Sequence, residues 1–444
     1  MGMRYIEQIK SIVLLFLVLL SIVLTFSIWT YTPSLQVIEE SQQVDQLVVG
    51  KKKELAEIIK PYRIIMREQN EWKGTIGSTT INDFVEMMTD WKFSDLIPVQ
   101  NNMSDKKINE FIRANQRITL FFSEKVPVKV FHSIVPFSQD ELPEMSFNKI
   151  ILDWSKMNAN KTLMVYFLSE ESRTLYSTEV KMSDIYFQST VLNTLKGLVA
   201  YQEIERSNGL SLYIPKDEIE LVQYTYYIDE IHADTFRDIL FYDPSIVRKN
   251  VENQDLVKYT DGMTLMTVDV KNRYLNYVNP SSESLVELPS SRLLLDSYEF
   301  VNEHGGFTGD YRLTSINNQK HVVEYQLYKQ GFPVFSVDTT TRITTTWGEN
   351  QLFRYKRPYF ILDLDINSEK IQRKMTSGLQ VIEFIQKNKQ LQLDEVDDII
   401  LGYYLKPNDN DLLFTLEPSW FAVSQGSWKR ITPEAIGGGN NGLE

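Results

Sequence analysis

The sequence predicts an α+β protein, with one N-terminal transmembrane helix followed by a multi-domain extracytoplasmic region of mixed helix and antiparallel sheet. Three observations predict this class. An uncharged apolar run occupies residues 12–29, segments rich in β-branched and aromatic residues alternate with helical periods beyond residue 33, and 444 residues exceed what one hydrophobic core usually supports. Hydrophobic residues make up 43% of the chain, so we expect these segments to fold.

The N-terminal run has the length and composition of a membrane span. From Ile12 to Trp29 it contains no charge, Gly or Pro, and as a helix rising about 1.5 Å per residue it extends roughly 27 Å. A cleaved signal peptide has a shorter apolar core followed by small residues at the cleavage site. We therefore expect this helix to be retained as an anchor.

The residues around the run predict its orientation. Arg4 and Lys10 precede it, the next basic residue is Lys51, and Trp29 and Tyr31 lie where an outer aromatic belt would be. We expect a cytoplasmic tail over residues 1–11, a single span over 12–31, and an extracellular remainder anchored to the cell membrane.

A first extracytoplasmic unit is expected over residues 33–200. Ser104 and Ser183 are candidate helix N-caps, because a serine hydroxyl can accept a hydrogen bond from a backbone N–H of the first helical turn. The predicted helices are Ile81–Trp91, Lys106–Asn115 and Ser183–Leu198. The predicted strands are Tyr62–Met66, Arg117–Ser123, Val126–Val135, Lys149–Trp154 and Thr162–Leu168.

A middle α+β unit is expected over residues 201–285, where the turn-forming residues 279–282 mark a boundary. Its predicted strands are Leu210–Ile214, Glu220–Ile228, Tyr259–Met266 and Leu275–Val278, and its predicted helix is Ala233–Phe241.

Residues 286–436 show a helix followed by strands twice, which predicts two helix-plus-sheet modules. The predicted helices are Ser290–Glu303, which Gly305 and Gly306 end, and Ser377–Lys389. The predicted strands are Tyr311–Leu313, His321–Lys329, Phe332–Thr339, Arg342–Trp347, Leu352–Tyr355, Ile399–Leu405, Leu412–Leu416 and a pair within Trp420–Ile431. The glycine-rich residues 437–444 are expected to form a disordered tail.

Composition excludes several functional classes. The chain has no cysteine, so it has no disulfide framework, no thiolate zinc site and no cysteine nucleophile. An exported protein without disulfides is typical of a Gram-positive bacterial surface. The formal net charge of -13 disfavours nucleic acid as a partner, because such binding needs basic residues that neutralise phosphates.

Two patterns of histidine and glycine do not support a chemical role. His132, His232, His304 and His321 are too far apart in sequence to form a local metal-binding pair. The residues 304–306 are similar to the oxyanion loop of some esterases, but no G-x-S-x-G motif accompanies them, and a helix stop explains them.

Three further patterns have simpler structural explanations. Asp363, Asp365 and Asn367 have the spacing that begins a calcium loop, but Ser368 replaces the required Gly and Lys374 replaces the closing Glu. Ser104 and Lys107 match a penicillin-binding motif in spacing alone, and a helix cap explains Ser104. Adjacent carboxylates such as Asp397 and Asp398 do not define a glycosidase pair. We therefore predict no catalytic residues, no cofactor and no metal site.

The membrane segment carries the one candidate contact surface. Leu14, Val18, Ser21, Thr25 and Ile28 share one helix face, and the small polar pair, four residues apart, permits close approach of a second helix in lipid. The alternative is that both hydroxyls bond to carbonyls of their own helix.

Several segments carry a resemblance to a known family. The residues 24–33 that end the membrane run, 259–262, 272–275 and 353–358 resemble the YycH family of low-GC Gram-positive bacteria, and the overall layout is similar from the first residue to near the last. The resemblance implies several α+β units and a non-enzymatic regulator of an essential two-component system that controls cell-wall metabolism. It implies contact with a sensor histidine kinase of the YycG/WalK type through membrane helices, together with a YycI-like single-span protein. It leaves open whether the kinase is restrained or stimulated.

Two other functions remain open on the residues themselves. A membrane-anchored cell-wall hydrolase would need a cleft with two acids about 5–9.5 Å apart. An ectodomain that binds a peptide or wall fragment would need an apolar pocket with convergent polar groups, and it could coexist with kinase regulation.

Overall fold

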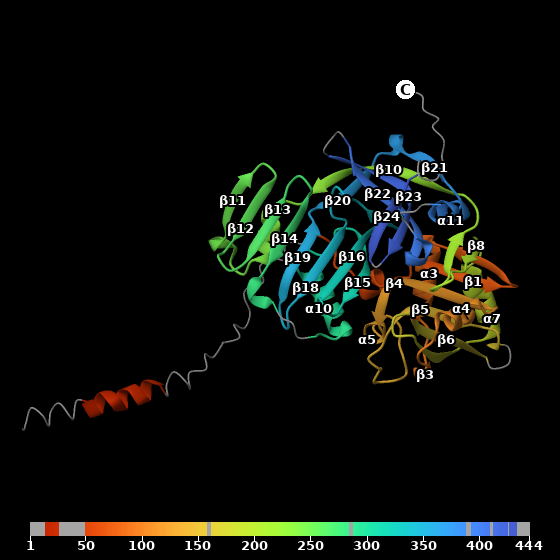
Figure 1. Ribbon diagram of the computed structural model, residues 1–444, viewed down its shortest axis with the longest axis horizontal. Coiled ribbons are helices and arrows are strands. Elements are labelled where there is room, and N and C mark those ends of the chain that lie inside the picture. Colours follow the sequence, from red (N-terminus) through yellow and green to blue (C-terminus); the bar gives the residue numbers. More distant parts are fainter. Residues whose placement is uncertain are drawn as a thin grey trace, which may run out of the picture. The chain divides into compact units, whose positions relative to one another are not determined.

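The computed structural model describes residues 14–25, 49–157, 161–283, 287–387, 392–408, 412–424 and 426–432. Residues 14–25 are helical and belong to one unit, and the described residues from 49 onward belong to a second, compact unit (Figure 1). Among the described residues, no helix has the length and apolarity that crossing a membrane requires. The predicted tails 1–11 and 437–444 lie outside them.

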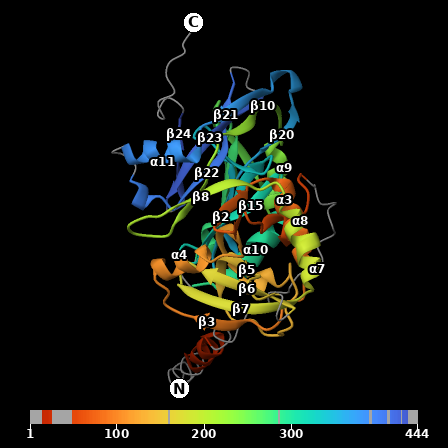
Figure 2. The ribbon, with the colours of Figure 1, turned by 90° about the vertical axis from the view of Figure 1, so that its right-hand side faces the viewer.

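Nine strands form the first sheet in the described chain, in the order β3-β7-β6-β5-β4-β1-β2-β8-β9. Its strands β3, β5, β6 and β8 are labelled in Figures 1 and 2. Its central strands are buried on both faces: Ile150 packs in one core with Phe84 of α3, and Ile151 packs in another with Ile108 of α4. Burial on both faces accounts for the continuous apolar run in β5. The strands are β1 (Arg63–Glu68), β2 (Glu71–Thr75), β3 (Ile97–Gln100), β4 (Arg117–Pro127), β5 (Ser146–Asp153), β6 (Thr162–Ser169), β7 (Thr174–Lys181), β8 (Val199–Ile204) and β9 (Leu212–Pro215).

The second sheet has fifteen strands within the described residues, and its main path runs β11-β12-β13-β14-β19-β18-β16-β17-β22-β23-β10-β20. Strands β15, β21 and β24 pair with β16, β10 and β23. The pairing is antiparallel except between β17 and β22. The strands are β10 (Ile219–Glu230), β11 (Arg248–Asn253), β12 (Leu256–Thr260), β13 (Leu265–Asp269), β14 (Tyr274–Val278), β15 (Asp310–Asn317), β16 (Val322–Lys329), β17 (Phe332–Phe335), β18 (Arg342–Trp347), β19 (Leu352–Pro358), β20 (Phe360–Asp365), β21 (Ile371–Met375), β22 (Asp398–Pro407), β23 (Leu413–Ser424) and β24 (Ser427–Ile431).

Helices cover both sheets. Leu293 and Val301 of α10 pack in the main core with Tyr325 of β16, and Val381 of α11 packs in a separate core with Trp420 of β23. The helices are α2 (Leu55–Ile58), α3 (Ser78–Thr89), α4 (Asp105–Arg113), α5 (Val128–Phe131), α7 (Asp184–Tyr186), α8 (Leu192–Thr194), α9 (Ala233–Leu240), α10 (Ser290–Glu303) and α11 (Gly378–Lys387), with a π-helical turn η1 (Phe187–Val191) and 3-10 turns η2 (Pro244–Ile246), η3 (Pro280–Ser282), η4 (Asn367–Glu369) and η5 (Leu393–Glu395).

The predicted helix caps are confirmed. The Ser104 hydroxyl accepts a hydrogen bond from the backbone N–H of Lys107 at 3.4 Å, and the Ser183 hydroxyl accepts one from that of Tyr186 at 3.1 Å. The predicted helix Ser290–Glu303 has the same bounds as α10.

Two predicted strands are wrong. The segment Val126–Val135 is the end of β4 followed by α5. Its β-branched and aromatic residues favour a strand, but its exposed residues Lys129, His132 and Ser133 have the i, i+3, i+4 spacing of a helix. The segment Tyr259–Met266 is two strands, β12 and β13. Asp261 divides it, since its carboxylate accepts hydrogen bonds from the backbone N–H groups of Met263 and Thr264, and Gly262 has φ +92°.

The start of the compact unit is bound to the loop that follows α10. The backbone N–H of Gly50 donates to the Gly305 carbonyl at 2.6 Å, and that of Phe307 donates to the Lys51 carbonyl at 3.2 Å. Gly306 has φ +67°, and its missing side chain lets the two backbones approach: a Cβ there would lie 2.7 Å from the Gly50 carbonyl oxygen. We call residues 49–53 the entry segment.

This close approach can be tested by Gly306→Ala. The substitution combines an unfavourable backbone conformation with a collision against the entry segment, so we expect it to lower the free energy of unfolding by about 2–4 kcal/mol. Gly262→Ala is the control, because Gly262 also has positive φ but has no atom within 4 Å of its Cβ position. That change should cost only about 1 kcal/mol in denaturant titrations. Equal losses would show that the backbone approach contributes nothing.

Candidate functional site

A buried ion pair joins the two sheets. Arg63 begins β1, is 3% exposed, and lies against Asp398, which begins β22. Its Nη2 is 2.9 Å from Asp398 Oδ2 and 3.1 Å from Oδ1, and Nη1 donates to the Tyr213 carbonyl at 2.9 Å. A guanidinium removed from water needs such a partner, so this pair constrains how the sheets meet.

Tyr62 completes the cluster. Its hydroxyl donates to Asp398 Oδ2, and its ring centroid lies 5.0 Å from the Arg63 guanidinium carbon. Burial, followed by the charge of Asp398, raises the pKa of Tyr62 well above its ordinary value, so the phenol keeps its proton and donates. Burial lowers the pKa of Arg63, but the charge of Asp398, its hydrogen bond to Arg63 and the neighbouring tyrosines Tyr62 and Tyr201 together outweigh burial, so the pKa is raised.

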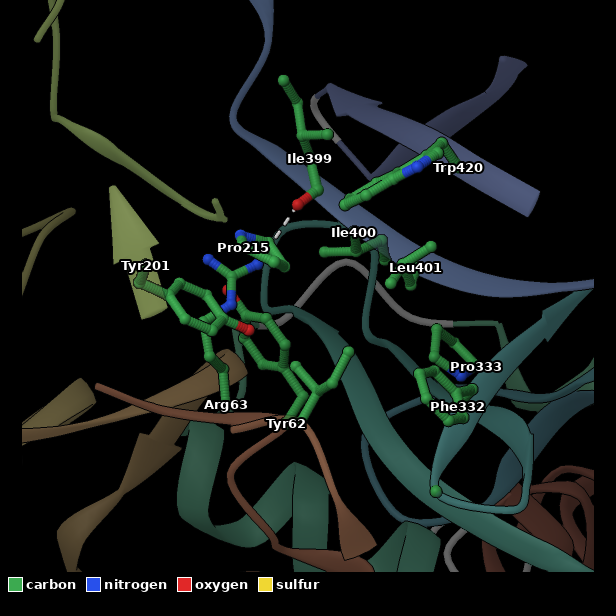
Figure 3. Close-up of a pocket in the computed structure, with 12 residues that line it drawn as sticks. Tyr62, Arg63, Tyr201, Pro215, Phe332, Pro333, Ile399, Ile400, Leu401 and Trp420 are labelled. Carbon is green, nitrogen blue, oxygen red and sulfur yellow. Dashed lines mark hydrogen bonds between the residues drawn. The ribbon is translucent and has the colours of Figure 1, made fainter. Parts of the chain in front are cut away.

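A small cavity lies beside this pair. Figure 3 shows the Arg63 side chain near the rings of Tyr62 and Tyr201, with a dashed line for its 3.3 Å hydrogen bond to the Ile399 carbonyl. The cavity has a volume of about 20 Å³, and Trp420 forms part of its apolar wall. That is room for little more than one water molecule, so this cavity is too small for a ligand.

A much larger cavity shares Tyr62 and Arg63 in its wall and lies between the two sheets. Its volume is about 770 Å³, which is in the range of ligand-binding sites. Phe122 and Lys149 line it from the first sheet, and Tyr328 lines it from the second. We call it the inter-sheet cleft.

Charged side chains line the cleft on both sides. Lys149 is 7% exposed and forms an ion pair with Glu170, and Lys125 forms one with Glu171 at 2.5 Å. On the second sheet, Arg342 pairs with Glu324 at 3.0 Å. Four further charged residues line the wall: Glu124, Arg173, Arg206 and Asp397.

Glu124 differs electrostatically from the other wall carboxylates. It lies where the β4–β5 register shifts between Phe121 and Val126, and it accepts hydrogen bonds from the backbone N–H groups of Lys125 and Ile316. Burial raises the pKa of Glu124 to about 7 against the lowering effect of these bonds. Its carboxylate therefore titrates near neutral pH.

The predicted membrane face lies only partly within the described residues. Leu14, Val18, Ser21 and Thr25 are on the helix of residues 14–25, and Ile28 lies outside the described residues. The Thr25 hydroxyl donates to the Ser21 carbonyl at 2.8 Å, which is the intrahelical bond considered as the alternative to a contact across helices.

The helix stop predicted at residues 304–306 is confirmed, and the aspartate motif lies at a strand end. The residues 304–306 end α10, with the Gly306 N–H donating to the Val301 carbonyl at 2.8 Å. Asp363 and Asp365 lie at the end of β20, and Asp365 pairs with Lys370 at 2.7 Å. In the part of the chain that is described, no group of three or more His, Asp or Glu residues is placed to hold a metal ion.

Sequence reasoning missed Arg63, Asp398 and the inter-sheet cleft. Each residue of the ion pair begins a strand, and nothing local distinguishes Asp398 from a surface charge. A basic residue directly before the apolar run Ile64-Ile65-Met66 was the available signal, because such a position is buried when both faces of the strand are covered.

Because this ion pair is buried, we expect Asp398→Asn to destabilise the protein strongly. The change leaves the Arg63 charge buried without a carboxylate, so the free energy of unfolding should fall by about 3–5 kcal/mol, measured by chemical denaturation. Glu205→Gln is the control, since Glu205 pairs with Arg113 but its side chain is 70% exposed. Its loss should stay below about 1 kcal/mol. A similar small loss for Asp398→Asn would mean that the pair does not hold the sheets together.

Comparison with known proteins assigns two family domains to the chain. Residues 7–196 match the family model described as YycH protein, N-terminal domain, and residues 210–436 match YycH protein, C-terminal domain. The crystal structure of YycH from Bacillus subtilis is similar in fold, with a TM-score of 0.73 and 18% identity over 87% of this chain and 99% of that chain.

A curated relative extends the match to nearly the whole length. The two-component system WalR/WalK regulatory protein YycH of Bacillus subtilis (strain 168) is 22% identical over 462 aligned residues, which cover 99% of this chain and 99% of the relative. Two family models that together cover well over half of the chain carry the assignment. The chain belongs to the YycH family.

Proposed function

We propose that this protein is a membrane-anchored, non-enzymatic regulator of the sensor histidine kinase in a two-component system of the WalR/WalK type. The observation that carries the proposal is the match over 99% of both chains to a relative named as a regulatory protein of that system. Because the match leaves out no large segment of either chain, the part of the relative responsible for regulation has a counterpart here.

The proposed location follows from the sequence. The apolar run from Ile12 to Trp29 would anchor the protein as a single span, with Arg4 and Lys10 holding the N-terminus inside. The remainder would lie outside the cell, where it can contact the extracellular part of a kinase. A YycI-like single-span protein is the second proposed partner, as the family resemblance implies.

The proposed contact with the kinase in the membrane is the face of Leu14, Val18, Ser21, Thr25 and Ile28. Helices in lipid associate by close packing and hydrogen bonds, because lipid removes the hydrophobic drive between them. Since the Thr25 hydroxyl already donates to its own helix, the small size of this pair would matter more than its hydrogen bonds. The face would then act as a surface for close packing.

This contact is tested by replacing Ser21 and Thr25 with Leu. Both changes raise apolarity, so membrane insertion and protein level should hold, but the added bulk would separate the helices. The amount of kinase recovered with the full-length protein after crosslinking in native membranes should fall at least about threefold. The double change Ser21→Ala with Thr25→Val adds less bulk and should have a smaller effect.

Leu15→Ile with Leu19→Ile changes a different face and serves as the control. If the Leu pair recovers and regulates the kinase as the unchanged protein does, this face is not the contact. If no kinase is recovered with the unchanged protein, the regulatory proposal itself fails.

Topology provides an independent check. A reporter that works only outside the cell should be active when fused after Glu444, and a reporter that works only in the cytoplasm should be inactive there. The mature protein should also retain residues 1–32. Activity of a cytoplasmic reporter at that position, or an N-terminus near Thr32 by protein sequencing, would contradict the proposed anchor.

The hydrolase alternative makes a different prediction. It requires that the protein release soluble fragments from purified cell wall, and the inter-sheet cleft would then hold the reacting acids. We expect no release, because this chemistry needs two available acids. The wall carboxylates Glu170, Glu171, Glu324 and Asp398 are each paired with a basic residue, and Asp397 also has a partner, which leaves Glu124 without a second acid.

A further inference from the structure

The wall of the inter-sheet cleft carries basic and acidic side chains in equal numbers, although the whole chain has a formal net charge of -13. Most of these charges are paired. The ion pairs within the wall are Arg63 with Asp398, Lys125 with Glu171, Lys149 with Glu170 and Arg342 with Glu324. Arg173 pairs with Asp105 outside the wall. Each of these charges is compensated by its partner, so these groups attract a charged ligand only weakly.

Glu124 and Arg206 are the exceptions, because neither forms an ion pair with any residue of the described chain, whereas Asp397 has a partner. The carboxylate of Glu124 is held by the backbone N–H groups of Lys125 and Ile316. Its orientation is therefore set by the backbone at the β4 irregularity, and its charge is not neutralised by a neighbouring cation in contact.

Arg206 is the corresponding cation. Its Nε donates to the Leu210 carbonyl at 2.6 Å, and Nη1 donates to the carbonyls of Val396 at 2.5 Å and Leu393 at 3.3 Å. Carbonyl oxygens orient the guanidinium but carry no formal charge. The cleft wall thus holds one fixed negative group and one fixed positive group that no ion pair neutralises.

Aromatic side chains provide an apolar surface in the same cavity. Phe335 and Trp428 both line the cleft, with ring centroids 5.1 Å apart, and the Trp428 side chain is half-buried. Such a surface favours an apolar group on the ligand.

We propose that the inter-sheet cleft binds a short peptide with free termini, whose α-ammonium group pairs with Glu124, whose carboxylate pairs with Arg206, and whose apolar side chain packs on Phe335 and Trp428. A ligand with one charge would leave the other wall charge uncompensated, whereas a peptide with both termini free compensates both. The inference does not depend on kinase regulation, because it rests on the cleft alone.

The test is equilibrium dialysis of the full-length protein in lipid nanodiscs against a pool of tripeptides that varies the central residue. Reference pools are the same peptides with an acetylated N-terminus or an amidated C-terminus, and empty nanodiscs serve as the blank. Mass spectrometry should show at least about tenfold greater retention of free peptides than of either capped pool. Equal retention of all pools, or no retention at millimolar peptide, would overturn the proposal.

Substitutions separate the two charged groups. Glu124→Gln keeps the acceptor oxygen but removes the charge, so preference for a free N-terminus should disappear while preference for a free C-terminus remains. Arg206→Gln should do the reverse, and Arg206→Lys, which keeps the charge, should retain part of the preference even if the carbonyl contacts weaken. Glu205→Gln changes the net charge equally outside the cleft and should bind as the unchanged protein does. Loss of both preferences in the control would refute the assignment.

A pH series adds a readout that a purely structural role of Glu124 would not produce. Burial raises the pKa of Glu124 to about 7, so its carboxylate loses charge as the pH falls below 7. The groups that face it are Lys125 on its own strand, Glu171 from the β6–β7 turn and the Ile316 N–H of β15, and no histidine lines the cleft within the described chain. Retention of N-terminally free peptides should weaken between pH 7.5 and pH 5.5, whereas Glu124→Gln should show no such change. Identical profiles for the two proteins would contradict the role of Glu124.

Discussion

The relative position of the two sheets depends on the buried pair of Arg63 and Asp398. The two residues lie at opposite ends of the sequence, yet the guanidinium is 3% exposed and has its carboxylate within 2.9 Å. A charge removed from water this completely is tolerated only in a narrow geometry, since misplacing the partner by a few ångströms forfeits the attraction that offsets its desolvation. Apolar contacts alone would tolerate small displacements of one sheet along the other, whereas the geometry of this ion pair does not.

The inter-sheet cleft follows from that fixed spacing. Its walls belong to separate sheets, so its volume of about 770 Å³ persists only while the sheets keep their separation. The paired charges along the walls help for a second reason: an unpaired array of like charges would push the walls apart, and the strength of this repulsion would change with pH and salt. The cleft is therefore preformed, and a ligand that enters it need not first open it.

Local features of the sequence predicted the local features of the fold. The caps at Ser104 and Ser183 and the glycine end of α10 are determined by neighbouring residues, so they could be recognised in the sequence. The pairing of β10 with β20, β21 and β23 could not, because it depends on strands far along the chain that share no local signal. The ion pair and the cleft belong to this second kind. The strand predicted at Val126–Val135 failed for a different reason, since its β-branched and aromatic residues favour a strand, whereas its exposed residues Lys129, His132 and Ser133 have helical spacing.

The entry segment has a mechanical consequence. Its backbone is bound to Gly305 and Phe307, and the Lys53 carbonyl accepts hydrogen bonds from the Tyr298 hydroxyl at 2.8 Å and the Asn302 amide at 3.0 Å. Tension applied to the chain ahead of residue 49 is shared among these bonds before any of it reaches β1. The load thus passes into α10 and the second sheet, and the first sheet, with the Arg63 end of the ion pair, is shielded from it. Traction on the leading chain would first break these partly buried hydrogen bonds, while the junction between the sheets stays unstressed.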